Sequence, residues 1–100
     1  MSTGMTRQEI KAVTEYLKYH KSTDIKPVKK IVYRDHNGCE FPYFVFHFKD
    51  EAGDELSGIY EIQHDGYVTE EEYCPRADEE DMIRGFLNDE FVDEDVSECE

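Results

Sequence analysis

The sequence has no tryptophan, only three prolines and three cysteines, and no long apolar run. Its longest apolar stretch, FPYFVF, is far shorter than the roughly 20 residues that cross a bilayer, and the start MSTGMTRQEI lacks the apolar segment of a secretory signal. An odd number of irregularly spaced cysteines is also unlike the disulfide framework of a small secreted domain. We therefore expect a cytoplasmic protein.

Catalytic and cofactor motifs are missing as well. The chain contains no GxSxG nucleophile motif, no glycine-rich phosphate loop and no CxxC pair. A zinc site could be assembled only from the scattered His36, Cys39, His64 and Cys74, and the segment DEAGDELSGIYE places alanine and glycine wrongly for a calcium loop. From these absences we expect no metal, no cofactor and no enzymatic activity. An enzyme would instead need a pocket that holds His47 or His64 as an acid or base.

Positive charge is scarce in one half of the chain only. Residues 1–48 carry eight Lys or Arg against five acids, whereas residues 50–100 carry two against twenty, within a net charge of −14. Such a field repels nucleic acid and anionic lipid from the acidic half and attracts cationic surfaces. We expect a basic protein as partner, with no direct binding of nucleic acid or membrane.

Thirteen aromatic residues in a chain of 100 favour a folded single domain over disorder. Thr6 and Glu9 form a capping-box pattern, which predicts a helix that starts at Thr6 and ends between Lys18 and His20. Its apolar stripe consists of Ile10, Val13 and Leu17.

Three glycine-containing turns then divide a segment of period-two patterning into four strands. Asn37-Gly38 predicts a two-residue hairpin that sets Ile31 opposite Phe44, and Glu51-Ala52-Gly53 predicts a three-residue loop that sets Phe46 opposite Gly58. Asp65-Gly66 predicts another tight hairpin, into a short strand near residues 67–73 whose acids protect an edge. The predicted core face comprises Ile31, Phe44, Phe46, Phe48, Leu56, Tyr60 and Ile62.

A second helix follows Pro75, with Asp78 as its predicted N-cap and an end near Glu90 or Phe91. The sequence thus predicts a two-layer α+β fold with an N-terminal helix, an antiparallel β-meander of three to four strands, a C-terminal helix and an acidic tail. We expect residues 1–5 to be flexible, residues 6–91 to form the domain and residues 92–100 to form the tail.

The sequence does not indicate which element packs on the second face of the meander. It carries Val32, Tyr43, Val45, His47 and Ile59, a mixture typical of neither core nor solvent. Either the second helix covers this face, or it is open to a partner or to a second copy in a homodimer.

The acids themselves allow two interpretations. A block of acids is typical of a solvated surface or tail. Alternatively, the predicted second helix presents about one negative charge per 3.3 Å, close to the roughly 3.4 Å per phosphate along one DNA strand. Under this hypothesis the partner-binding residues are Asp78, Glu79, Glu80, Asp81, Asp89, Glu90, Asp93, Glu94 and Asp95, flanked by Glu70, Glu71 and Glu72.

In its size, acidity and lack of catalytic motifs the chain resembles phage- or plasmid-encoded inhibitors of nucleic-acid-processing machinery, including anti-CRISPR and anti-restriction proteins that mimic DNA, and nuclease-immunity proteins. No shared motif carries this likeness. It implies an inhibitor that occludes the basic nucleic-acid-binding surface of a nuclease or other nucleic-acid-binding protein, in the host-cell cytoplasm if a phage encodes it. The alternative is a chaperone or adaptor that binds an extended protein segment through a hydrophobic sheet face.

Overall fold

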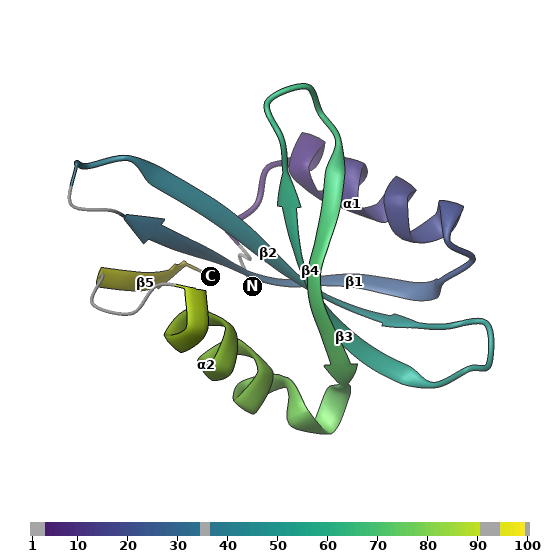
Figure 1. The fold of residues 1–100 in the computed structure, drawn as a ribbon. Helices are drawn as coiled ribbons and strands as arrows, with labels where there is room; N and C mark the ends of the chain where they lie inside the picture. The colour runs from purple at the N-terminus through teal and green to yellow at the C-terminus, as the bar shows by residue number, and fades with distance from the viewer. Residues whose placement is uncertain (1–3, 35–36, 91–94, 100) are drawn as a thin grey trace.

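The computed structural model describes residues 4–34, 37–90 and 95–99, with side chains described for 4–34 and 37–87. It is an α+β fold built on one antiparallel sheet, with strand order β4-β3-β2-β1-β5 (Figure 1). The elements are α1 (Arg7–Tyr19), β1 (Thr23–Arg34), β2 (Glu40–Lys49), β3 (Glu55–Ile62), β4 (Val68–Pro75), a 3₁₀ turn η1 (Arg76–Asp78), α2 (Glu79–Glu90) and β5 (Asp95–Cys99).

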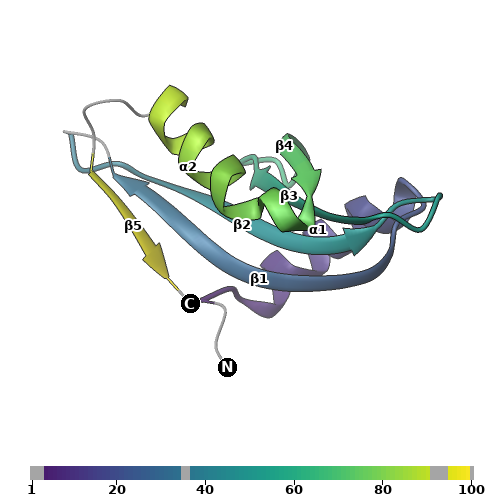
Figure 2. The ribbon, with the colours of Figure 1, turned by 90° about the horizontal axis from the view of Figure 1, so that it is seen from below.

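The two helices lie on opposite faces of the sheet, so the domain has three layers rather than the two predicted (Figure 2). Under α1 the buried cluster contains Val13 and Leu17 with Phe44, Phe46, Phe48 and Tyr60. Under α2 it contains Met82, Ile83 and Phe86 with Ile31, Tyr33, Tyr43, Val45 and Ile59. Both faces of the central strands are therefore buried. The second helix, α2, covers the face of the meander that carries Tyr43, Val45 and Ile59.

The predicted capping box starts α1. Glu9 N donates to Thr6 Oγ1 at 3.1 Å, and Thr6 N donates to Glu9 Oε1 at 2.8 Å. These two bonds satisfy backbone donors that the first turn of a helix leaves unpaired. The helix then buries Val13 and Leu17, which are 0% and 1% exposed.

The register predicted between the first two strands is wrong by one residue. Ile31 lies opposite Tyr43, not Phe44, because residues 35–39 connect the strands instead of Asn37-Gly38 alone. A shift of one residue moves every side chain of a strand to the other face. Ile31 is therefore buried under α2, while Lys30 lies opposite Phe44 with its ammonium 5.8 Å from the ring centre and 3.5 Å from Glu9.

The next two strand connections are turns at the predicted glycines, Gly53 and Gly66. Phe46 lies opposite Gly58 as predicted, and Asp50 N donates to Asp54 O across the loop that contains Gly53. Gly53 and Gly66 have φ of +85° and +89°, a conformation that glycine adopts without steric penalty. Gln63 N donates to Tyr67 O at 2.7 Å, so the turn at Asp65-Gly66 has three residues.

The C-terminal segment adds a strand that the sequence analysis does not assign. The backbone of β5 pairs antiparallel with β1, with Asp95 opposite Arg34 and Cys99 opposite Lys30. The domain boundaries proposed at residues 5 and 91 remain a prediction. Among the described residues no helix has both the length and the apolar character needed to cross a membrane.

Candidate functional site

An exposed group of carboxylates lies where β4 ends and α2 begins. We define the acidic corner as Glu72, Asp78, Glu80 and Asp81, all exposed. The pKa of the nearby Cys74 thiol is raised by burial and, in addition, by the charges of Asp78, Glu79 and Glu72. Glu72 of the strand, Asp78 and Glu79 therefore lie near the same thiol, and Glu80 and Asp81 follow them in the first turn of α2.

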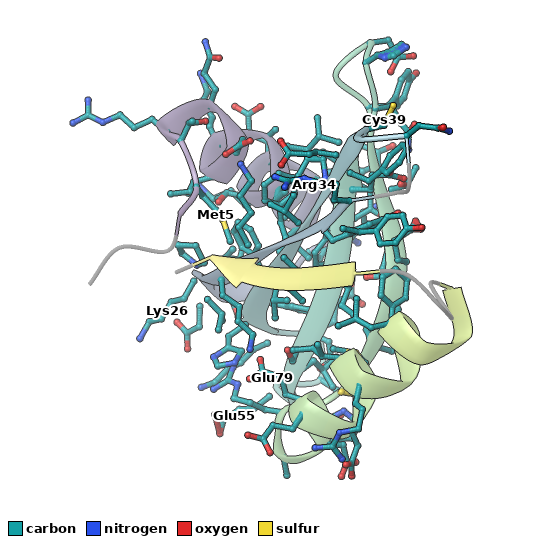
Figure 3. All side chains as sticks on the ribbon, turned by 90° about the vertical axis from the view of Figure 1, so that its left-hand side faces the viewer. Met5, Lys26, Arg34, Cys39, Glu55 and Glu79 are labelled. Carbon is teal, nitrogen blue, oxygen red and sulfur yellow. The ribbon has the colours of Figure 1, made fainter. Side chains whose placement is uncertain are left out.

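Glu79, predicted as a partner-binding residue, points toward the sheet instead of toward solvent (Figure 3). Its Oε1 accepts a hydrogen bond from Ser57 Oγ at 2.6 Å and lies 2.7 Å from His47 Nε2. Ser57 and His47 are register neighbours on β3 and β2, and Ser57 has no exposed surface. Glu79 therefore anchors the start of α2 to the sheet, since a carboxylate removed from water needs such partners.

These three residue types occur in hydrolytic triads, but the order differs here. In a triad the imidazole lies between the hydroxyl and the carboxylate, so that it can take the hydroxyl proton. Here the carboxylate of Glu79 lies between Ser57 and His47. Because Ser57 is fully buried, its hydroxyl has no access to a substrate.

The acidic row on β4 is divided between the two faces of the sheet. The strand register shifts at Glu71, so Glu70 lies opposite Tyr60 and Glu72 lies opposite Ile59. Tyr60 Oη donates to Glu70 Oε2 at 2.9 Å on the side of α1. Glu70 is thus separated from the acidic corner, while Glu72 belongs to it.

The remaining predicted residues belong to the C-terminal segment. Asp89 and Glu90 continue the backbone of α2, and Asp95 begins β5, but their side chains lie outside the described residues. Asp93 and Glu94 also lie outside the described part of the chain. Whether these acids continue the acidic corner stays a prediction.

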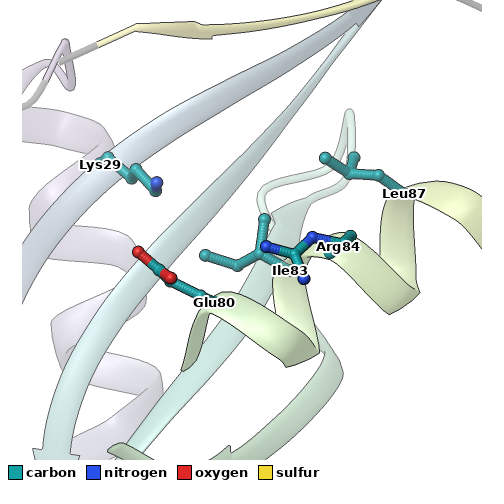
Figure 4. Close-up of a pocket in the computed structure, with 5 residues that line it drawn as sticks. All are labelled: Lys29, Glu80, Ile83, Arg84 and Leu87. Carbon is teal, nitrogen blue, oxygen red and sulfur yellow. The ribbon is translucent and has the colours of Figure 1, made fainter. Parts of the chain in front are cut away.

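Cationic side chains border the acidic corner. Arg84 Nη1 lies 3.6 Å from Asp81 Oδ1, and both side chains are exposed. A hollow of about 340 Å³ separates α2 from β1, and in it Glu80 and Arg84 of the helix face Lys29 of the strand (Figure 4). The negative surface of the corner is therefore bounded by positive charge on the side toward β1.

Two exposed tyrosines, Tyr19 and Tyr67, were not predicted from the sequence to form part of a site. Tyr19 and Tyr67 are 83% and 72% exposed, the two most exposed of the large hydrophobic residues described. Tyr19 and His20 lie three and four residues after Tyr16 at the end of α1, which is the signal that could have indicated a shared aromatic surface.

The described residues contain no group of three or more His, Cys, Asp or Glu side chains arranged to hold a metal ion. Comparisons of the chain with protein-family models, with curated proteins and with solved structures find no match.

Proposed function

We propose that this chain is a non-enzymatic binding protein whose acidic surface occupies the basic nucleic-acid-binding surface of a partner protein. It would act as a DNA-mimicking inhibitor in the manner of anti-CRISPR, anti-restriction or nuclease-immunity proteins. The observation that carries the proposal is the acidic corner, four exposed carboxylates held on a strand end and a helix start.

The position of these charges suits recognition of a basic groove. Asp78, Glu80 and Asp81 lie within four consecutive residues at the end of η1 and the start of α2, about 4.5 Å of helix axis at about 1.5 Å per residue. Three charges over this length are at least as dense as the phosphates of one DNA strand, which are roughly 3.4 Å apart. Because η1 and α2 fix their backbones, little conformational freedom is lost on binding.

Burial of the sheet disfavours the alternative, a chaperone or adaptor that binds through the face containing Tyr43 and Val45. Tyr43 is 7% exposed and its ring packs edge-on against Phe86 of α2, with 5.2 Å between ring centres. Val45 has no exposed surface. An extended segment, or a second copy in a homodimer, would have to displace α2 to reach these residues.

A matched pair of charge variants tests the proposal. Glu80→Gln/Asp81→Asn removes two charges from the acidic corner, and Glu51→Gln/Asp54→Asn removes the same two types of charge from the β2–β3 turn. Each pair includes one acid in an exposed ion pair, Asp81 with Arg84 and Glu51 with Lys21, both at 3.6 Å. The lost ion pairs should therefore change stability little in either variant, but the corner variant also loses the favourable interaction of its acids with the first turn of α2, about 0.3–1 kcal/mol each, so the two are compared at matched folded concentration.

The measurement is capture of partner proteins from a cell lysate at low and at high salt. We expect the wild type and the turn variant to retain a nucleic-acid-binding protein at low salt and to release it at high salt, because counterions compete for the same charges. The corner variant should retain much less of it. Equal capture by both variants, or salt-resistant capture of a partner without a basic surface, contradicts the proposal.

A further inference from the structure

Hollows lie on the opposite face of the sheet, where α1 contacts β3 and β4 and the hairpin of these strands crosses the helix (Figure 1). Two hollows of about 370 and 490 Å³ adjoin there, because Tyr16 and His20 line both of them. Each volume lies within the range of about 300–1,000 Å³ typical of ligand pockets. We call the two hollows together the aromatic groove.

The rim of the aromatic groove is formed by exposed tyrosines. Tyr19 and Tyr67 line the larger hollow, and Tyr73, 60% exposed, lines the smaller one. The ring of His20 lies 4.5 Å from that of Tyr16 and 5.3 Å from that of Tyr19, centre to centre. Tyrosines gathered in this way are typical of protein-binding surfaces, because each offers a large apolar face and a hydroxyl.

The charges that line the aromatic groove are all negative. Glu15 lines the larger hollow, Asp50 and Glu70 line the smaller one, and no Lys or Arg among the described residues lines either. Glu70, an exposed residue of β4, lines the smaller hollow and accepts the hydrogen bond of Tyr60. Burial and, after it, the charge of Glu70 raise the pKa of Tyr16. A carboxylate has several lone pairs, so Glu70 can accept a further donor.

We propose that the aromatic groove binds an arginine side chain from an extended segment of a protein partner. A guanidinium group stacks on tyrosine rings and donates two parallel hydrogen bonds to a carboxylate, and it sheds water more readily than an ammonium group. The groove provides ring faces and carboxylates within the same hollows, whereas the acidic corner provides carboxylates without rings. This inference does not depend on the proposed function, since the groove and the corner lie on opposite faces of the sheet.

The test uses two capped peptides of equal length, acetyl-Gly-Arg-Gly-Arg-Gly-amide and the same peptide with citrulline in place of arginine. Citrulline keeps the shape of arginine but has no charge. Amide resonances of the protein are followed by NMR as each peptide is added. We expect the arginine peptide to shift the amides of Tyr16, His20 and Tyr67 in a saturable way, and the citrulline peptide to bind about tenfold more weakly.

Two variants keep the test decisive. Tyr19→Ser/Tyr67→Ser removes two exposed rings, so the fold is retained, and it should weaken binding of the arginine peptide about tenfold. Glu80→Gln/Asp81→Asn should leave the groove titration unchanged. Shifts spread over all exposed acids, equal binding of the citrulline peptide, or wild-type affinity in the tyrosine variant would overturn the inference. None of these results would affect capture through the acidic corner.

Discussion

The two faces of the sheet carry similar helices but present different surfaces. On one face α2 packs over Tyr43, Val45 and Ile59, and its acids remain at its start as an exposed corner. On the other face α1 packs over Phe44 and Phe46 but leaves hollows beside β4. The two surfaces therefore differ in more than charge: the corner presents carboxylates alone, and the groove presents carboxylates beside aromatic rings.

Each face also contains one glutamate that serves the fold. Glu79 binds Ser57 and His47 under α2, and Glu70 binds Tyr60 under α1. Glu79 joins segments 22 and 32 residues away in sequence, whereas Glu70 joins two neighbouring strands ten residues apart. The structural role of Glu79 can be separated from binding by mutation, while Glu70 also lines the aromatic groove.

The largest expected effect comes from the core beneath α1. Leu17 is 1% exposed, and its truncation in Leu17→Ala should lower the free energy of unfolding by about 2–5 kcal/mol, since it removes buried methyl groups and leaves a cavity. Chemical denaturation measures the loss. Arginine-peptide binding, which uses this face, should weaken in the variant more than partner capture by the acidic corner does; equal losses would show that the faces are not independent.

Gly58 tests how closely the α1 face is packed. A Cβ at this position would lie 2.5 Å from Tyr60 Oη and 2.8 Å from its ring, and Tyr60 is fully buried. We expect Gly58→Ala to destabilise the domain by about 1–3 kcal/mol through overpacking. Gly85→Ala in α2 is the control: apart from its chain neighbours and the backbone of its own helix, no described atom lies within 4 Å of a Cβ at this position, and a helical alanine should stabilise by about 0.5–1 kcal/mol.

Glu79→Gln separates anchoring from binding on the α2 face. The amide keeps the shape of the carboxylate but loses the charge-assisted bonds to Ser57 and His47, so stability should fall by about 1–2 kcal/mol. Partner capture at matched folded concentration should be retained, because the exposed acids remain. A large loss of capture with unchanged stability would place Glu79 in the contact surface instead.

Tyr60 makes the α1 face sensitive to alkaline pH. Burial, then the charge of Glu70 and the hydrogen bond to it, raise the pKa of Tyr60 well above its ordinary value. The unfolded chain releases this proton above about pH 10, while the folded chain keeps it, so stability must fall as pH rises. Unfolding free energies at pH 9 and 11 should decrease less in Tyr60→Phe than in the wild type, by up to about 1.4 kcal/mol for one pH unit. Equal slopes would show that Tyr60 does not contribute.

The sequence predicted the α1 start and the β2–β3 register because local signals determine them. Thr6 and Glu9 are three residues apart, and Gly53 supplies the positive φ that its loop needs. The β1–β2 register could not be read from Asn37-Gly38, because burial of Ile31 under α2 and contacts of Lys30 with Phe44 and Glu9 favour a longer connection.

The same distinction applies to the candidate site. Composition predicted an acidic surface, and the structure places Glu72 and Asp78 near the same Cys74 thiol, with Glu80 and Asp81 in the first turn of α2. The inward orientation of Glu79 depends on His47 and Ser57, which are 32 and 22 residues away in sequence. The division of Glu70 from Glu72 likewise depends on a register shift against β3 that no local pattern indicates.

The most direct test of occlusion is competition for one captured partner. The immobilised partner is saturated with this chain, and duplex DNA or RNA, whichever it binds, is then added at increasing concentration. We expect mutually exclusive binding, with release of the chain as nucleic acid binds and earlier release of Glu80→Gln/Asp81→Asn. A stable complex that holds partner, chain and nucleic acid together would contradict it.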